Sequence, residues 1–247
     1  MTGVQVLNER LATAKRVTVM TGAGVSAASG VPTFRGADGL WRTFRAEDLA
    51  TLEAFRRDPV LVWEWYDWRR TLIAECHPNA AHRTLAAWSA REGLTLITQN
   101  VDGLHEQAGT RRVIRFHGSI WELRCATGCG TPAWEDRRAP LPSLPPHCPA
   151  CGGLARPGVV WFGEGIDRRV LIACEPALAC DVFLSVGTSS IVYPAAGLAH
   201  AARDHGAFTV EINPTATDAA AALDLAIAAP AEQVLPLLRW NREPMNP

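Results

Sequence analysis

The chain has 247 residues, 48% of them hydrophobic and 20% charged, and this composition excludes a globally disordered protein. Its 24 basic and 25 acidic residues give a formal net charge of -1, so neither a nucleic-acid-binding surface nor a solvating acidic tail is expected. The first residues lack the apolar core of a signal peptide, and the apolar segment 219–231 is too short to span a bilayer. We therefore expect a soluble, cytoplasmic protein with no nucleic-acid or membrane partner, and its oligomeric state stays open.

Short β-branched segments alternate with longer segments rich in Ala, Leu and Arg, which is typical of a parallel sheet covered by helices. The predicted strands are 17–21, 94–98, 113–116, 182–186, 208–212 and 223–227. The predicted helices are 4–14, 59–75, 80–92, 194–205 and 231–240. With no internal repeat and no long linker, residues 1–247 are expected to form a single α/β domain with a small insert.

The alternation stops between about Ile120 and Val160, where repeated prolines interrupt any helix or central strand. A segment of this kind cannot easily bury a core of its own, so it needs a covalent or metal cross-link. The odd number of cysteines, seven, together with the absence of an export signal, argues against a disulfide framework.

Four of the cysteines lie inside this proline-rich segment, as two closely spaced pairs with 18 residues between them. They are Cys125, Cys129, Cys148 and Cys151. Such spacing is typical of a tetrahedral structural zinc site, and no ligand position is left open for chemistry. The sequence thus predicts a zinc-binding insert over 121–160; four thiols without metal, or His147 in place of one thiolate, are the alternatives.

The segment Thr21–Ala27 directly follows a predicted strand and opens a predicted helix. It fits the pattern G-x-G-x-x-A, in which glycines let the backbone approach a pyrophosphate at a helix N-terminus. A tight strand-to-helix turn without a nucleotide explains the same residues about equally well. No acidic residue ends a second strand at the usual offset, since Glu47 and Asp48 lie outside any predicted strand, so a simple hydride-transfer dehydrogenase is not supported.

Further motifs follow in order along the chain. They are Gly22–Ser26 with 29–36 (Ser-Gly-Val-Pro-Thr-Phe-Arg-Gly), 98–105 (Thr-Gln-Asn-Val-Asp-Gly-Leu-His), 116–119 (Phe-His-Gly-Ser), 159–164 (Val-Val-Trp-Phe-Gly-Glu), 187–190 (Gly-Thr-Ser-Ser) and 211–213 (Glu-Ile-Asn). Together, over roughly residues 15 to 236, they resemble the sirtuins, a family of NAD-dependent protein lysine deacylases. The resemblance implies a Rossmann-like parallel sheet with helices on both faces and a small zinc domain, with both substrates in the groove between them.

The resemblance also implies that NAD is consumed as an electrophile rather than used as a redox carrier. Nicotinamide leaves, the acyl oxygen attacks the ribose, and a base deprotonates a ribose hydroxyl so that O-acyl-ADP-ribose is released. His117 matches that base, since an imidazole titrates near neutrality. An isolated histidine at a strand end is more often a satisfied core residue, and that structural interpretation is kept for five others. These are His77, His82, His147, His200 and His205.

Asn100 and Asp102 match family positions that hold the nicotinamide amide and the ribose, although Asn-x-Asp-Gly is also good turn chemistry. Phe34 would shield the reactive sugar from water, and Thr33 stands where the family commonly has Asp. The full set implied for NAD is Gly22, Ala23, Gly24, Ser26, Thr33, Phe34, Arg35, Trp41, Gln99, Asn100, Asp102, Gly187, Thr188, Ser189, Asn213 and Ala231.

Tyr66 and Arg69 are three residues apart in a predicted helix and therefore share one side of it. A phenol beside a guanidinium can bind a carboxylate through charge-assisted hydrogen bonds. The pair resembles class III sirtuins, which implies removal of succinyl and malonyl groups, together with acetyl. A Trp-rich amphipathic helix with a solvated Arg69 is the structural alternative.

The resemblance further implies that the acyl-lysine peptide pairs as a strand beside Val159 and Val160. The other substrate residues that it implies are Ala46, Val101, Phe162, Gly163 and Glu164. Three alternative functions remain: an NAD-dependent protein ADP-ribosyltransferase, a mainly acetyl-specific deacetylase, and a catalytically idle nucleotide sensor.

Overall fold

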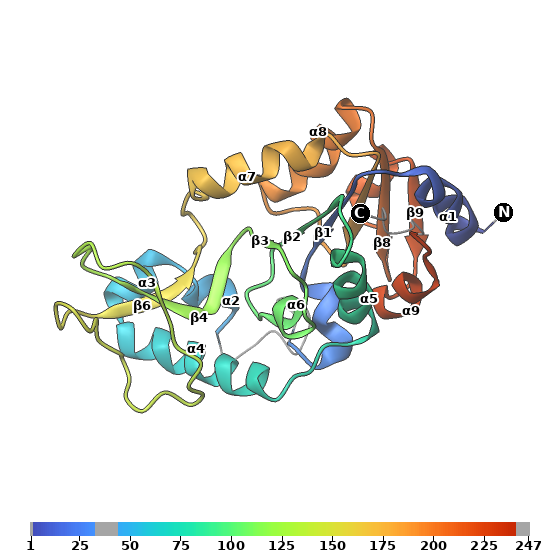
Figure 1. The fold of residues 1–247 in the computed structure, drawn as a ribbon. Helices are drawn as coiled ribbons and strands as arrows, with labels where there is room; N and C mark the ends of the chain where they lie inside the picture. The colour runs from blue at the N-terminus through green and yellow to red at the C-terminus, as the bar shows by residue number, and fades with distance from the viewer. Residues whose placement is uncertain (1, 33–43, 241–247) are drawn as a thin grey trace.

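The computed structural model describes residues 2–32 and 44–240, and Figure 1 shows them as two lobes. Four residues predicted to bind NAD lie outside the described residues, namely Thr33, Phe34, Arg35 and Trp41. Within the two described ranges, no helix combines the length and the apolar character needed to cross a membrane.

The larger lobe contains a six-stranded parallel sheet with the order β3-β2-β1-β7-β8-β9. Its strands are β1 (Val17–Thr21), β2 (Leu94–Thr98), β3 (Val113–Arg115), β7 (Val182–Val186), β8 (Phe208–Asn213) and β9 (Leu225–Ala228). This is the strand order of a dinucleotide-binding Rossmann fold, in which ligands bind at the carboxyl ends of the strands where the order reverses. The reversal here lies between β1 and β7.

Helices cover both faces of the sheet, as predicted. They are α1 (Gly3–Thr13), α5 (Ala80–Ser89) and α9 (Ala231–Val234) on one face, and α7 (Arg168–Leu178) and α8 (Leu198–Asp204) on the other. Alternate strand residues point to opposite faces. Leu184 therefore packs with Leu7 and Leu85 in one core, whereas its neighbour Phe183 packs with Ala202 in the other.

Two predicted helices are partly 3-10 turns in the structure. The segment 194–205 begins as a 3-10 turn (Ala195–Gly197) before α8. The segment 231–240 leaves the α-helix after Val234, because Pro236 cannot donate the next helical hydrogen bond and a 3-10 turn (Leu235–Leu237) follows. The predicted helix after the glycine loop is also a 3-10 helix, η1 (Ala23–Ser29).

The smaller lobe has a three-stranded antiparallel sheet with the order β5-β4-β6, which the sequence did not predict. Its strands are β4 (Gly118–Cys125), β5 (Trp134–Glu135) and β6 (Ala155–Val159). Pro157 is tolerated in β6 because this strand lies at the edge of the sheet.

Three further helices, α2 (Ala46–Leu49), α3 (Leu52–Arg57) and α4 (Pro59–Ala74), complete this lobe. Their apolar residues share one buried cluster with the antiparallel sheet. Trp63 of α4 is fully buried there, and its indole Nε1 donates to the Ala155 carbonyl at 2.8 Å. The predicted insert at 121–160 is therefore only part of a lobe whose core also needs residues 46–74.

Candidate active site

The glycine loop after β1 packs directly against the loop after β7. The amide of Gly24 donates to the Gly187 carbonyl at 2.9 Å, and a Cβ on Gly24 would lie 2.8 Å from the Gly187 Cα. Gly187 has a φ of +60°, and a Cβ on it would lie 2.5 Å from the Val25 nitrogen. These glycines are thus required for contact between two loops, a role that the nucleotide pattern did not reveal.

A hydrogen-bond network joins this loop to the loop after β2. The Ser26 hydroxyl donates to Asp102 Oδ2 at 2.8 Å and accepts from the Asn100 amide at 3.1 Å. The same amide donates to the Gly22 carbonyl at 3.0 Å, and Asp102 Oδ1 accepts from the Leu104 amide. Burial raises the pKa of Asp102, and these hydrogen bonds oppose that effect. These hydrogen bonds hold the loops after β1 and β2 together, although Gly22 and Asn100 are 78 positions apart in the chain.

Two histidines lie behind this network. His82 Nε2 is 3.3 Å from the Ser26 hydroxyl, and its ring centre is 4.8 Å from that of His105. Burial lowers the pKa of His82 to about 3 and that of His105 to about 4, so both are neutral near pH 7. His82 is a buried structural residue, as predicted, and it also contacts Ser26, which belongs to the predicted NAD set.

His117 lies in the two-residue turn between β3 and β4. Its Nδ1 lies 3.1 Å from the Gln99 carbonyl, which can only accept, so Nδ1 carries the hydrogen and Nε2 carries the lone pair. Burial lowers the pKa of His117, and the hydrogen bond to Gln99 opposes that effect. The ring is therefore a neutral base whose tautomer is set by the neighbouring loop.

The loops after β7 and β8 meet at the same edge of the sheet. Asn213 donates through Nδ2 to the Thr188 carbonyl at 3.1 Å, and the buried Thr188 hydroxyl is 2.9 Å from that of Ser185. Ser189 follows in the same loop, and Ala231 is buried at the start of α9, whose residues contact η1. Of the predicted NAD residues that the structure describes, those in the loops after β1, β2, β7 and β8 gather at one edge of the sheet, the edge at which Rossmann folds bind dinucleotides.

The predicted acyl-pocket pair lies in the core of the smaller lobe. Tyr66 is 3% exposed and Arg69 is 7% exposed, which contradicts the alternative of a solvated arginine. The Arg69 guanidinium packs over the Trp65 ring at 5.3 Å, and burial lowers its pKa while the charge of Asp102 raises it. Ala46 is buried in the same cluster, and Val101 packs against it. The pair thus lies in the core of the smaller lobe, close enough to the Asp102 loop for the charge of Asp102 to act on Arg69.

The predicted substrate segment, 159–164, begins at the last residue of β6 and continues past His117. The Val160 amide donates to the His117 carbonyl at 2.9 Å, which joins the two motifs. Phe162 is 45% exposed, and its amide donates to the Ala50 carbonyl. Glu164 binds Arg156 with both carboxylate oxygens, at 2.6 and 2.8 Å. Glu164 therefore shapes this segment, and Gly163, with a φ of +83°, makes the turn before it.

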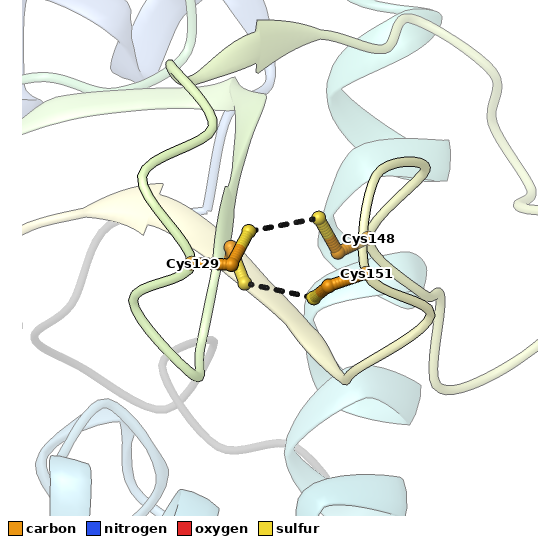
Figure 2. Close-up of side chains that lie close together, drawn as sticks. Cys129, Cys148 and Cys151 are labelled. Carbon is orange, nitrogen blue, oxygen red and sulfur yellow. Dashed lines mark hydrogen bonds between the residues drawn. The ribbon is translucent and has the colours of Figure 1, made fainter.

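The four predicted zinc ligands come together at the far end of the smaller lobe. Figure 2 shows the sulfur atoms of Cys129, Cys148 and Cys151 directed toward one another. Sulfur pairs are 3.6 Å apart for Cys125 and Cys151 and 3.7 Å apart for Cys129 and Cys148. Tetrahedral zinc with bonds of about 2.3 Å places its sulfurs about 3.8 Å apart, so the cluster fits zinc.

The donor chemistry of the cluster also suits zinc. The hydroxyl of Thr127 lies 3.0 Å from the sulfur of Cys125, and this hydrogen bond, together with hydrogen bonds from Cys129, lowers the pKa of that thiol to about 5. A thiolate is the form that binds a metal. The four sulfurs lie within 4.8 Å of one another. His147 is not a member of the described cluster, which disfavours its substitution for a thiolate.

Sequence reasoning missed Trp121 and Trp161 as parts of the site. The Trp121 indole donates to the Asp102 carbonyl at 2.6 Å, and the Trp161 indole donates to the Tyr66 hydroxyl at 2.9 Å. Each indole donates a hydrogen bond to a predicted site residue, but neither tryptophan was itself among the predicted NAD or substrate residues. Trp161 lies within the predicted substrate motif 159–164, and this place in the motif is the one sequence feature that could have indicated its role.

Comparisons with known proteins agree with this geometry. A model of the Sir2 family matches residues 22–194. An NAD-dependent protein deacylase of Aquifex aeolicus is 53% identical over 203 residues, 81% of this chain and 84% of that protein. A solved complex of a Sir2 homologue with NAD has a TM-score of 0.88 at 43% identity, over 94% of this chain and 90% of the other. Sir2Af2 bound to a myristoylated histone peptide has a TM-score of 0.77 at 32% identity, over 95% and 94%.

Proposed function

The chain belongs to the Sir2 family and is an NAD-dependent protein deacylase, and we propose that it removes succinyl and malonyl groups from lysine side chains as well as acetyl groups. NAD is its co-substrate, and the four-cysteine cluster fits a structural zinc ion. When bound, NAD would supply an electrophilic carbon, the ribose carbon from which nicotinamide departs.

The observation that carries the acyl preference is the burial of Tyr66 and Arg69 side by side in α4. Desolvation strengthens the interaction of a guanidinium with an anion, so a distal carboxylate would bind here far better than a methyl group. The charge of Asp102 reaches Arg69, and Trp161 contacts Tyr66. Because Asp102 belongs to the predicted NAD set and Trp161 to the predicted substrate strand, the pair is suited to the end of an acyl chain.

We assign the catalytic base to His117. Its Nδ1 donates to the Gln99 carbonyl, so the Nε2 lone pair is free to take a proton from a ribose hydroxyl. We assign Asn100 and Asp102 to the nicotinamide and ribose side, as the family resemblance implies, and Ser26 holds both side chains in place. Rigid placement of these groups lets them act without reorganising.

The protein substrate is proposed to be an acyl-lysine in an extended segment that pairs with the backbone near Val160. Main-chain pairing tolerates many sequences, which agrees with a family enzyme that acts on proteins. Sir2Af2 binds a myristoylated histone peptide and shares this fold. The exposed Phe162 is suited to contact the apolar stem of the lysine.

The test is the substitution Arg69→Met, which removes the charge and keeps an unbranched apolar side chain. We expect kcat/KM for a succinyl-lysine peptide to fall by about 10- to 100-fold, the value of a charge-assisted hydrogen bond, with little change for the acetyl-lysine peptide. Steady-state kinetics on the two peptides with saturating NAD measures this. Equal losses on both peptides would reject the carboxylate-binding role.

Arg70→Met is the matched control, since Arg70 is the next residue of the same helix and is also buried. Its guanidinium donates to the carbonyls of Ile120 and Asp136 rather than facing Tyr66. Its loss should lower the stability of the smaller lobe and reduce the turnover of both peptides alike.

Two alternative functions predict different products or ratios. A protein ADP-ribosyltransferase would leave ADP-ribose on the protein and would not need Tyr66 and Arg69. A mainly acetyl-specific deacetylase would turn over the acetyl peptide far faster than the succinyl or malonyl peptide. Product analysis and the ratio of kcat/KM values for the wild-type protein separate the three.

A further inference from the structure

Trp161 touches the predicted acyl pocket through a single directed contact. It lies just after β6 and is 1% exposed, and its indole Nε1 is 2.9 Å from the Tyr66 hydroxyl oxygen. An indole N–H can only donate, so the phenol oxygen must accept this hydrogen bond. The direction of the contact is therefore fixed by the chemistry of the indole.

This direction restricts the hydroxyl hydrogen of Tyr66. With one lone pair of its oxygen occupied by the indole, the hydroxyl hydrogen has to point away from Trp161. Burial raises the pKa of Tyr66, so the phenol keeps its hydrogen throughout the neutral range. The phenol is consequently held as a donor, and Arg69, whose charge also acts on Tyr66, lies on the same helix.

Trp161 is itself held from several sides. The Arg156 guanidinium lies 3.6 Å above the centre of its ring, and the Phe55 ring centre is 5.3 Å away. Glu164 binds Arg156 with both carboxylate oxygens and also accepts from the Trp161 backbone amide at 2.9 Å. The indole thus has one position and one orientation, set by residues of the substrate segment.

We propose that Trp161 is a positioning residue for acyl selectivity, which orients the Tyr66 hydroxyl so that its hydrogen is donated to the distal carboxylate of the acyl group. This role rests on the proposed function, since only a carboxylate-bearing acyl group uses that donor. Trp161 needs no contact with the acyl group for this purpose. Selectivity then depends on a pair of residues 95 positions apart in the chain.

The hydrogen bond itself can be measured without any substrate. The chain has only two tyrosines, Tyr66 and Tyr193, so protein labelled with ¹³C at tyrosine Cζ gives two signals, which Tyr193→Phe assigns. We expect Trp161→Phe to shift the Tyr66 signal and to leave the signal of the exposed Tyr193 in place. An unshifted Tyr66 signal would overturn the proposal.

A second variant covers the case in which Trp161→Phe does not fold. Tyr66→Phe keeps the aromatic ring and removes only the acceptor oxygen. It should move one indole N–H resonance of the ¹⁵N-labelled protein, that of Trp161. If no indole resonance moves, the phenol does not accept from Trp161 and the proposal fails.

The functional arm is a double-mutant cycle on the selectivity ratio, kcat/KM for succinyl-lysine over that for acetyl-lysine. Losing one directed hydrogen bond should lower this ratio about 3- to 10-fold in Trp161→Phe. In the Tyr66→Phe background, the same substitution should leave the ratio unchanged within about twofold, because the hydroxyl is already gone. A merely structural role for Trp161 would lower turnover of both peptides and leave the ratio alone.

Trp240→Phe is the control, because Trp240 is also 1% exposed and its indole donates to a backbone carbonyl, that of Ala14. It should change stability and not the ratio. If wild-type protein turns over only acetyl-lysine, the proposed function fails and takes the positioning role with it, whatever the spectra show. If wild-type protein turns over succinyl-lysine and Trp161→Phe keeps the ratio, only the positioning role fails.

Discussion

The charge state of His117 is set by its burial and by its hydrogen bond to Gln99 in the loop after β2. The Gln99 carbonyl fixes the hydrogen on Nδ1, and burial lowers the pKa, so the lone pair on Nε2 is present at neutral pH. The nearby His82 and His105 stay neutral to far lower pH, since their pKa values are about 3 and 4. Of these three imidazoles, the half-buried His117 is the one suited to act as a base, since His82 and His105 are fully buried.

The pH dependence of turnover follows from this arrangement. A base is active when unprotonated, and a lowered pKa moves its protonation to the acid side of the ordinary value of 6.5. We expect kcat/KM for an acyl-lysine peptide to fall with acid along a limb whose midpoint lies below pH 6.5. A pH series at constant ionic strength measures the profile, and an acid limb centred above pH 6.5 would contradict the assignment.

At the scale of elements, the loop after β1 and the loop after β7 form a single unit. Backbone packs on backbone where Gly24 meets Gly187, so neither loop has room for a side chain at that point. The cofactor edge of the sheet therefore depends on a contact between strands that are far apart in the chain but adjacent in the sheet.

Gly24→Ala tests this contact. The new Cβ would lie 2.8 Å from the Gly187 Cα, so we expect the free energy of unfolding to fall by about 1–3 kcal/mol and NAD binding to weaken. Denaturant unfolding and calorimetric titration with NAD measure the two effects. Gly197→Ala is the control, since its Cβ would meet only the Tyr193 ring at 3.8 Å, and it should change stability by less than about 0.5 kcal/mol. Equal behaviour of the two variants would contradict the packing argument.

At the scale of the whole molecule, the smaller lobe combines a shared apolar core with a metal cluster at its far end. Its core needs α4 as well as the antiparallel sheet. Cys125 ends β4, and the other three cysteines lie in the irregular loops between β4 and β6. Zinc is expected to tie these loops together, since they contain little regular structure.

Removal of one ligand should show this role. Cys148→Ala is expected to lose bound zinc and to lower the Tm, whereas Cys174→Ala should keep zinc, because Cys174 is buried in the other lobe and burial raises its pKa to about 11. Metal analysis and thermal unfolding of purified protein are the measurements. Zinc retained at the wild-type level in Cys148→Ala would exclude the four-thiolate site.

The larger lobe could be predicted closely from sequence, because continuous β-branched strands such as 182–186 are a local signal. The smaller lobe could not, because its core joins Trp63 to Ala155 across 92 positions and no local pattern indicates that contact. The site residues were predicted from motifs, but the residues that hydrogen-bond to them were not. Trp161 and His82 contact predicted site residues in distant segments, and a single sequence does not display such contacts.

The central claim is that the chain consumes NAD to transfer a carboxylate-bearing acyl group from lysine. Mass spectrometry of a reaction of NAD with a succinyl-lysine peptide tests it most directly. We predict nicotinamide, desuccinylated peptide and O-succinyl-ADP-ribose in equal amounts. The variant His117→Ala should form none of these products but should still bind NAD. ADP-ribosylated peptide, or products formed only from an acetyl-lysine peptide, would contradict the account.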